Sequence, residues 1–194
     1  MKAELQARLD GWNASPDWVV KRSDGGARAS LLAVPGEPPA LRFEVELDCA
    51  ASACADYTIH RLLETQGEWN HSFLDGDRVD EGDHRLYRLA YAGVWPVKPR
   101  DFVYRAWISP DDDGGATEIS GSVVDERFGP APGRVRGRIL LAWRRVEALG
   151  PDRCRYTSIA QSDIGGHVPG WMVTPGVIKN MFSELGHIRV ALGC

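Results

Sequence analysis

Residues 78–163 contain five successive strand-length runs separated by turn residues, and this feature limits the possible folds more than any other part of the chain. The segment DDDGG at 111–115 predicts a tight hairpin tip between two of these runs. Many short strands joined by turns favour one antiparallel sheet. The five runs cover residues 84–92, 100–109, 116–125, 134–149 and 153–163, and three earlier runs cover residues 18–22, 29–34 and 41–47.

Helical spacing of apolar side chains occurs in three segments around these strands. It predicts an N-terminal helix within residues 1–14, one or two helices over residues 52–65 with Ser52 as the N-cap, and a long amphipathic helix over residues 169–193. The strand runs are punctuated by helices and do not alternate with them one by one. This order predicts the α+β class, an antiparallel sheet with a face covered by helices.

Composition excludes several broad classes of function. The 194 residues carry 23 Lys and Arg against 27 Asp and Glu, a net charge of −4, which is too acidic for nonspecific nucleic-acid binding. The length favours one domain, and we expect a monomer. The charged N-terminal segment MKAELQARLDGW interrupts any signal-peptide core, and no apolar run approaches a membrane span, so we expect a cytoplasmic protein.

No motif for metal, cofactor or catalytic chemistry is present in the sequence. The four cysteines show neither a CxxC pair nor a His at zinc-like spacing, and we interpret them as reduced thiols. The five histidines are scattered, and GxSxG, GxxxxGK[ST] and GxGxxG patterns are absent. We therefore expect no metal, no cofactor and no catalytic residue.

Two further patterns concern the side chains of the predicted strands. Seven Trp, five Tyr and five Phe could line an apolar pocket, although each one alone could equally fill an ordinary core. In the run 134–149, four arginines share one parity, whereas four apolar residues share the other. The basic face is either a solvated outer surface or a patch for acidic headgroups or a protein partner. The arginines are Arg134, Arg136, Arg138 and Arg144, and the apolar residues are Val135, Ile139, Leu141 and Trp143.

Four short segments resemble one known family. They are PRDFVY at 99–104, GEWN at 67–70, VR at 135–136 and DIGGHVPGW at 163–171. Their order and spacing are similar to those of the START (StAR-related lipid-transfer) domain family, and the resemblance covers residues 15–192. Each segment alone is weakly specific, but four in register make an accidental match improbable.

The resemblance implies a helix-grip fold, in which a curved antiparallel β-sheet wraps around the C-terminal helix and encloses a hydrophobic cavity. It also implies a single START-like lipid-binding domain over residues 1–194, with residues 169–193 as the gating helix. Such a domain binds one lipid or other hydrophobic small molecule and transfers or senses it. In this family the loop matching 111–115 borders the cavity mouth; here it is acidic, so we expect only transient membrane contact.

The resemblance also implies which residues have structural and ligand-binding roles. The family's buried cavity arginine corresponds to Ala106 and its glutamate partner to Tyr87, so we expect a pocket that is polar only through hydroxyls. We expect Arg100, Asp101, Arg136 and Asp163 to be structural. The residues expected to contact the ligand are Trp69, Tyr87, Leu89, Tyr91, Phe102, Tyr104, Ala106, Ile108, Trp143, Trp171, Met172, Ile178, Met181, Phe182 and Leu185, with Trp171 and Met172 at the gate.

Three functions remain open from the sequence. The first is a noncatalytic carrier. The second is an enzyme like the aromatase/cyclase proteins of the wider helix-grip superfamily, with Tyr87 or Tyr104 as the acid. The third is a ligand-sensing module that moves its last helix and docks a partner on the arginine face.

Overall fold

The computed structural model describes residues 1–93, 97–166, 168 and 170–194, except for the side chains of residues 170–172. In this part of the chain ten strands form one sheet, in the order β1-β2-β3-β10-β9-β7-β6-β5-β4, with β8 paired to β6. The strands are β1 (Val19–Asp24), β2 (Ala27–Leu32), β3 (Ala40–Leu47), β4 (Phe73–Glu81), β5 (His84–Tyr91), β6 (Arg100–Pro110), β7 (Ala116–Ser122), β8 (Val135–Arg136), β9 (Arg138–Gly150) and β10 (Arg153–Asp163).

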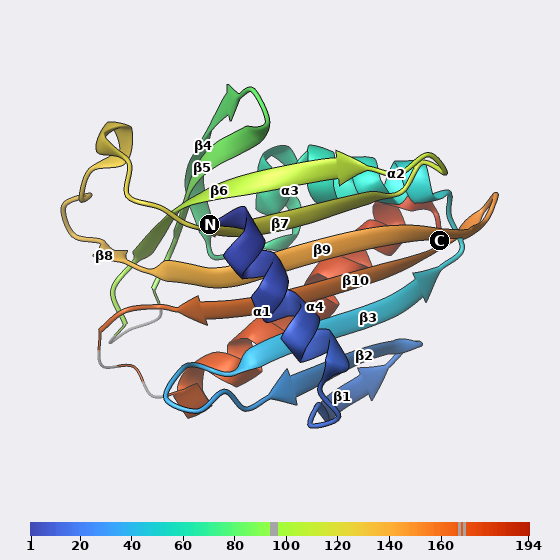
Figure 1. Ribbon diagram of the computed structural model, residues 1–194, viewed down its shortest axis with the longest axis horizontal. Helices are drawn as coiled ribbons and strands as arrows, with labels where there is room; N and C mark the ends of the chain where they lie inside the picture. The colour runs from blue at the N-terminus through green and yellow to red at the C-terminus, as the bar shows by residue number, and fades with distance from the viewer. Residues whose placement is uncertain (94–96, 167, 169) are drawn as a thin grey trace.

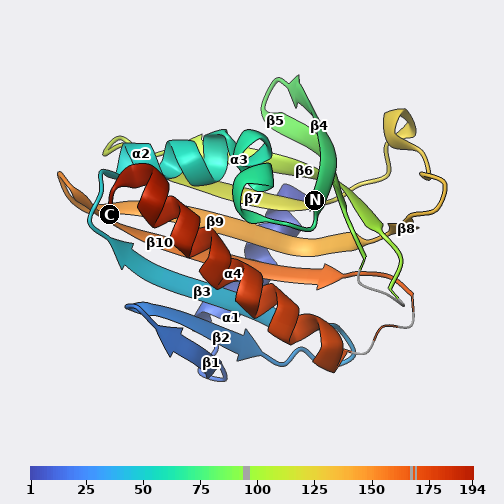
Figure 2. The same ribbon diagram turned by 180° about the vertical axis from the view of Figure 1, so that it is seen from behind.

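Helices cover both faces of this curved sheet. The long helix α4 (Gly170–Leu192) crosses the concave face diagonally, with α2 (Ala51–Ala55) and α3 (Leu62–Trp69) beside it (Figure 2). The N-terminal helix α1 (Lys2–Ala14) lies on the opposite, convex face (Figure 1). The sheet is antiparallel apart from the short parallel pair β6–β8. The predicted α+β class and helix-grip fold are confirmed.

The structure corrects two sequence predictions in the region before β5. Of the one or two helices predicted over residues 52–65, the structure has two, α2 and α3, joined by a π-helical turn, Asp56–His60. The N-cap is Ala50 and not Ser52, and it makes no side-chain hydrogen bond. Strand β4 was not predicted, because its sequence FLDGDRVDE has little apolar alternation. This polar sequence suits its position as an edge strand, where few side chains face the core.

The buried side chains form distinct groups on the two faces of the sheet. On the convex face, Leu9, Trp107 and Trp143 pack in one group under α1. On the concave face, a larger group under α4 includes Phe43 and Ile188. We call this second group, with the strands β2, β3 and β10 beneath it, the packed half of the concave face.

A β-bulge in β9 reverses the direction of its side chains. Leu141 pairs with Gln161 and Ile139 pairs with Ser162, so Leu140 is an extra residue in β9. The hydroxyl oxygen of Ser122 accepts a 2.8 Å hydrogen bond from the Ile139 amide at this position. After the bulge the residues with even numbers face the concave side. The unbroken parity predicted over residues 134–149 is therefore wrong.

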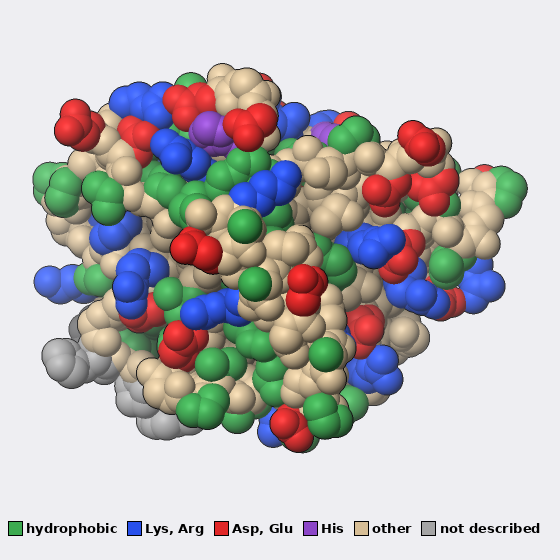
Figure 3. All heavy atoms as spheres, in the orientation of Figure 1, with side chains coloured by type: hydrophobic (Ala, Val, Ile, Leu, Met, Phe, Trp, Pro, Cys, Tyr) green, Lys and Arg blue, Asp and Glu red, His purple; other side chains and the backbone are tan. Residues whose placement is uncertain are grey.

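The bulge also changes the interpretation of the arginine face. Arg144, which was expected beside Arg134, Arg136 and Arg138 on the outer face, points into the concave side. The other three pair with the carboxylates of Asp75, Asp101 and Asp163 respectively. Figure 3 shows acidic and basic groups interspersed on the convex face. The four arginines therefore do not form one basic surface.

Candidate functional site

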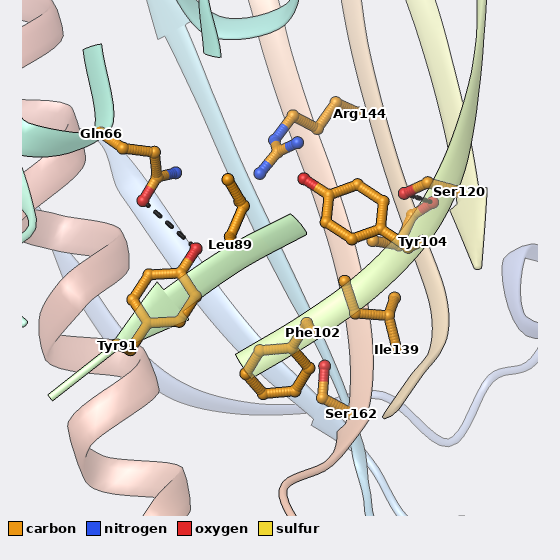
Figure 4. A pocket seen from close by; sticks show the side chains of 10 residues that line it. Gln66, Leu89, Tyr91, Phe102, Tyr104, Ser120, Ile139, Arg144 and Ser162 are labelled. Atoms are coloured by element: carbon orange, nitrogen blue, oxygen red, sulfur yellow. Dashed lines mark hydrogen bonds between the residues drawn. The ribbon is translucent and has the colours of Figure 1, made fainter. Parts of the chain in front are cut away.

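A cleft of about 140 Å³ lies on the concave face, between α3 and strands β5 to β10, beside the packed half (Figure 4). A cavity of about 150 Å³ holds a molecule the size of benzene. We call this region the hollow half of the concave face. It is lined by Gln66, Leu89, Tyr91, Phe102, Tyr104, Ser120, Ile139, Ala142, Arg144 and Ser162.

Gly137 lies against the ring of Phe102, which forms part of one wall of the cleft. A Cβ atom at this position would lie 2.3 Å from the ring of Phe102, which lines the cleft. Any larger residue would therefore displace Phe102 or the junction between β8 and β9. The glycine thus allows the aromatic ring to pack directly against the backbone.

A buried ion pair joins two strands at the cleft. The guanidinium Nη1 of Arg144 on β9 donates to Oε1 of Glu118 on β7 at 3.0 Å, and Glu118 is fully buried. Burial alone would lower the pKa of Arg144, but the Glu118 carboxylate beside it raises the pKa overall. Burial raises the pKa of Glu118, although Arg144 opposes this shift. Among the described residues, Oε2 of Glu118 has no hydrogen-bond partner.

A second buried carboxylate approaches the same guanidinium from α4. Glu184 accepts a 3.3 Å hydrogen bond from the hydroxyl of Tyr156 on β10. Burial raises the pKa of Glu184, and the charge of Arg144 partly offsets that rise. One arginine therefore lies near two buried carboxylates, so this region has hydrogen-bonding capacity that its own ion pair does not use.

The remaining polar groups of the cleft are neutral. The hydroxyl of Tyr91 donates to Oε1 of Gln66 at 3.4 Å, and the hydroxyl of Ser120 donates to the carbonyl of Ala142 at 3.4 Å (Figure 4). Figure 4 also shows the Tyr104 hydroxyl directed toward Arg144. Burial raises the pKa of both tyrosines, so their hydroxyls stay protonated at neutral pH.

The structure brings only some of the expected ligand-binding residues to the cleft. Leu89, Tyr91, Phe102 and Tyr104 line it. Tyr87 and Ala106 lie in the same buried group but behind the lining, and the ring of Tyr87 stacks on that of Tyr104 at 5.2 Å. The prediction that Tyr87 and Ala106 line the cavity is therefore not met in this state.

The expected helix residues fill the packed half instead of lining the cleft. The ring of Phe182 meets that of Phe43 edge-on at 5.3 Å. These residues do not line the cleft, because α4 runs diagonally over β2 and β3, and their contact with a ligand stays a prediction. The residues concerned are Ile178, Met181, Phe182 and Leu185, and Ile108 of β6 packs with the same group.

The last expected ligand-binding residues lie elsewhere. Trp143 packs under α1 on the convex face, because the bulge reverses its direction, so its predicted cavity position is wrong. Trp69 is buried at the end of α3, where its carbonyl accepts a 3.3 Å hydrogen bond from Ser183 of α4. The side chains of Trp171 and Met172, the expected gate, lie outside the described residues.

The charged pair at the cleft was not predicted from the sequence. The expectation of a pocket polar only through hydroxyls is wrong, because Arg144 and Glu118 supply charges from other strands than the family's pair. Alternation along β7 could have placed Glu118 on the inner face, since it shares the parity of Ser120. Arg144 could not be found this way, because nothing in the sequence marks the bulge at Leu140.

The four residues expected to be structural make contacts at the end of the sheet beside the cleft. Asp101 is almost fully buried and forms two hydrogen bonds with Arg136, at 3.0 and 2.8 Å. Arg100 donates to the carbonyl oxygens of Lys98 and Ile164. The carboxylate of Asp163 accepts from the Gly165 amide and from Arg138, which lowers its pKa. These bonds connect β6, β8 and the segment before α4.

Comparison with known proteins decides the family. The START domain model matches residues 3–192. The chain belongs to the START domain family. It is 26% identical over 157 residues to a Rho GTPase-activating protein 7 from Bos taurus, covering 79% of the chain and 14% of the relative. It is 31% identical over 112 residues to a Protein ENHANCED DISEASE RESISTANCE 2-like from Arabidopsis thaliana, covering 55% and 16%. The START chain thus spans less than a fifth of these relatives.

Solved structures show the same fold. Human StAR-related lipid transfer protein 5 superposes with a TM-score of 0.85 at 17% identity, covering 98% of this chain and 94% of that one. A STAR-related lipid transfer protein from Xanthomonas axonopodis has a TM-score of 0.74 at 24% identity, covering 92% and 99%. The Zhui aromatase/cyclase from a Streptomyces species is more distant, with a TM-score of 0.55 at 12% identity, covering 79% and 93%.

Neither a metal site nor a membrane-spanning helix is found in the described part of this START domain. No group of three or more His, Cys, Asp or Glu side chains there has a geometry suited to a metal ion. No helix there is both long enough and apolar enough to span a bilayer.

Proposed function

We propose that this START domain binds one lipid or other hydrophobic small molecule in the hollow half and carries or senses it without changing it chemically. The observation that carries the proposal is the cleft itself, in which mainly apolar walls surround the guanidinium of Arg144. Family membership supports a hydrophobic ligand. Two superposable proteins are named for lipid transfer, which favours a lipid.

The polar groups indicate what part of the ligand they would hold. The guanidinium of Arg144, the one charged side chain among the described lining residues, can only donate hydrogen bonds. It would hold an accepting oxygen of the ligand, such as that of a hydroxyl group. The apolar remainder of the ligand would lie along Leu89, Phe102 and Ile139, where burial contributes about 25 cal/mol per Å².

The size of the cleft requires movement for a larger ligand. A volume of about 140 Å³ accommodates one ring-sized group, and a whole lipid needs several times that space. The element that can move is α4, whose polar contacts with the rest of the domain include those of Glu184 and Ser183. We propose that α4 shifts outward when a larger ligand enters, and that its apolar contacts with β2, β3 and β10 re-form when the ligand leaves.

We further propose that the domain acts as a monomer in the cytoplasm and touches membranes only transiently. The tip of the β6–β7 hairpin, residues 111–115, carries three consecutive carboxylates that an anionic bilayer would repel. Gly114 at this tip, with φ of +86°, lies against Ser52 of α2. Nucleic acid is not a partner in this proposal, because the net charge is −4.

Native mass spectrometry tests the binding proposal. The purified protein is incubated with vesicles made from a total lipid extract, separated from them, and weighed intact; any bound molecule is then extracted and identified. We expect one molecule bound per protein. The matched control, Ala142→Trp, fills the cleft from its wall and should carry none. Equal loading of both proteins, or loading of neither, would contradict the proposal.

A second candidate function is a cyclase that acts on a bound polyketide. The observation that favours it is Glu118, a buried carboxyl whose pKa is raised and which lies near the Tyr104 hydroxyl, because such groups serve as acids and bases. The same mass measurement separates the two functions. A carrier returns its ligand with unchanged mass and structure, whereas a cyclase releases a product that has lost water.

A further inference from the structure

All four cysteines of the chain meet at one end of the sheet, although they come from four separate segments. Cys49 follows β3, Cys54 lies in α2, Cys154 is the second residue of β10, and Cys194 follows α4. All belong to the packed half or pack against it. Figure 1 shows the C-terminus beside α2 and the β9–β10 hairpin, at the end of the sheet where β3 terminates.

Cys49 and Cys154 are held together by strand pairing. Cys154 pairs with Leu47 on β3, two residues before Cys49. This register places the Sγ atoms of Cys49 and Cys154 3.9 Å apart, both buried. The contact does not depend on flexible side chains, because seven consecutive residue pairs align β3 with β10.

The other two cysteines complete the environment of Cys49. Gly193 has a φ of +71°, and the Cys194 amide donates to the Arg189 carbonyl at 3.0 Å, an arrangement that ends α4 and turns Cys194 back toward the body. The thiol of Cys54, and then those of Cys194 and Cys154, interact with the Cys49 sulfur. Together they lower the pKa of Cys49 to about 6, although burial opposes this shift.

Two observations favour redox chemistry over other roles. The described residues contain no group of three cysteine, histidine or carboxylate side chains arranged for a metal ion, which argues against metal binding by these thiols. Ordinary core packing needs no thiols, and the chain places all four of its cysteines in this one location. A thiolate is the reactive form of cysteine, and it needs a second thiol nearby to form a disulfide.

We propose that Cys49 and Cys154 form an oxidation site that becomes a disulfide when the protein meets a peroxide. The Cys49 thiolate attacks one oxygen of hydrogen peroxide, the O–O bond breaks, and hydroxide leaves with a sulfenic acid on Cys49. The Cys154 sulfur then attacks that sulfenic sulfur and displaces a second hydroxide. In sum, two thiols and one peroxide give one disulfide and two waters.

The oxidation site is distinct from the cleft. Ser162, which lines the cleft, is eight residues from Cys154 on β10, a separation of roughly 26 Å along an extended strand. The disulfide would close a long loop between positions 49 and 154, which restricts the unfolded chain. We expect oxidation to raise Tm by roughly 5–15 °C and to leave binding in the cleft unchanged.

Intact mass and peptide mapping test the site. The purified, reduced protein is treated with a small molar excess of hydrogen peroxide, quenched, and digested without reducing agent. We expect the protein to lose the mass of two hydrogen atoms and the digest to contain one Cys49–Cys154 linked peptide. Cys154→Ser should instead accumulate sulfenic acid on Cys49, detectable with dimedone. Cys194→Ser keeps both sulfur atoms of the site and should still give the Cys49–Cys154 peptide, but more slowly, because it removes one thiol that lowers the pKa of Cys49.

Several results would overturn the proposal. These are an unchanged mass, a disulfide between another pair of cysteines, oxygen added to single cysteines in the wild type, or a metal ion retained by the freshly purified protein. The mapping of the wild-type protein needs no variant, so a folding defect in Cys154→Ser does not affect it. A negative outcome would leave the proposed ligand binding intact, because the cleft shares no residue with this site.

Discussion

The packed half and the hollow half lie on one face of one sheet, but they differ in the side chains they contain. The packed half is filled with apolar side chains, whereas the hollow half contains a charged pair beside a cleft. In the packed half, α4 lays Leu185 and Ile188 on apolar strand residues, and both are almost fully buried. In the hollow half, Arg144 lies partly buried beside a space that no described side chain fills, and its partner Glu118, which does not line that space, is fully buried. The first arrangement stabilises the fold. The second has a cost in stability, because desolvated charges are only partly compensated by each other.

This difference supports the hollow half as the proposed binding region. A region that served stability alone would gain from apolar residues in place of the ion pair, because such replacements are often neutral or stabilising. This supports the proposal that a ligand accepts hydrogen bonds from Arg144, the residue of the pair that lines the cleft. The four predictions below alter one half while the other serves as the reference.

The largest expected effect comes from breaking the ion pair. Arg144→Met leaves the fully buried Glu118 without its partner and should lower the free energy of unfolding by about 3–5 kcal/mol. The double variant Arg144→Met/Glu118→Leu should recover most of that loss. Urea denaturation of the three proteins measures this, and a double variant as unstable as the single one would show that the pair itself stabilises the fold.

A cavity in the packed half comes next. Ile188→Ala removes a fully buried side chain and should lower the free energy of unfolding by about 2–4 kcal/mol, while ligand affinity changes little. Ile178→Ala, on the same helix but only partly buried, is the matched control and should lose less than half as much. If Ile188→Ala abolished binding without unfolding the protein, the separation between the two halves would fail.

Filling the hollow half should have a smaller and opposite effect on stability. Ala142→Val adds two methyl groups to the wall of the cleft and should raise the free energy of unfolding by about 0.5–1 kcal/mol, while weakening ligand binding. Thermal denaturation with and without ligand measures both quantities. A variant that binds as well as the wild type would indicate that the ligand occupies another part of the domain.

The smallest expected effect is a pH dependence that originates at the border of the two halves. The pKa of Glu184 is raised in the folded state, so the folded protein binds more protons than the unfolded chain just above the ordinary glutamate pKa. This residue therefore makes the protein less stable as pH rises through that window. Glu184→Gln should flatten the decrease of Tm between pH 5 and 7; an unchanged slope would exclude this origin.

The sequence predicted the framework better than the site. Strand-length runs and the C-terminal amphipathic pattern gave the sheet and α4, because alternation and helical spacing survive in the fold. Side-chain direction was predicted correctly on β5 and β6, whose pairing is regular, and Leu89 and Phe102 do line the cleft.

The missed features are those set by tertiary structure. The bulge at Leu140 turned Trp143 outward and Arg144 inward, and a single extra residue leaves no mark in an apolar run. The diagonal path of α4 moved Phe182 from the cleft to the packed half. The meeting of Cys49 with Cys154 depends on strand order, which residue spacing does not reveal.

The most direct test of the central claim compares two isosteric ligands small enough for the cleft as it stands, phenol and toluene. Their dissociation constants are measured by NMR titration for the wild type and for Arg144→Met/Glu118→Leu. We expect the wild type to bind phenol at least about tenfold more tightly than toluene, because the phenol oxygen accepts a hydrogen bond from Arg144, and we expect the variant to prefer toluene. The same preference in both proteins would contradict it.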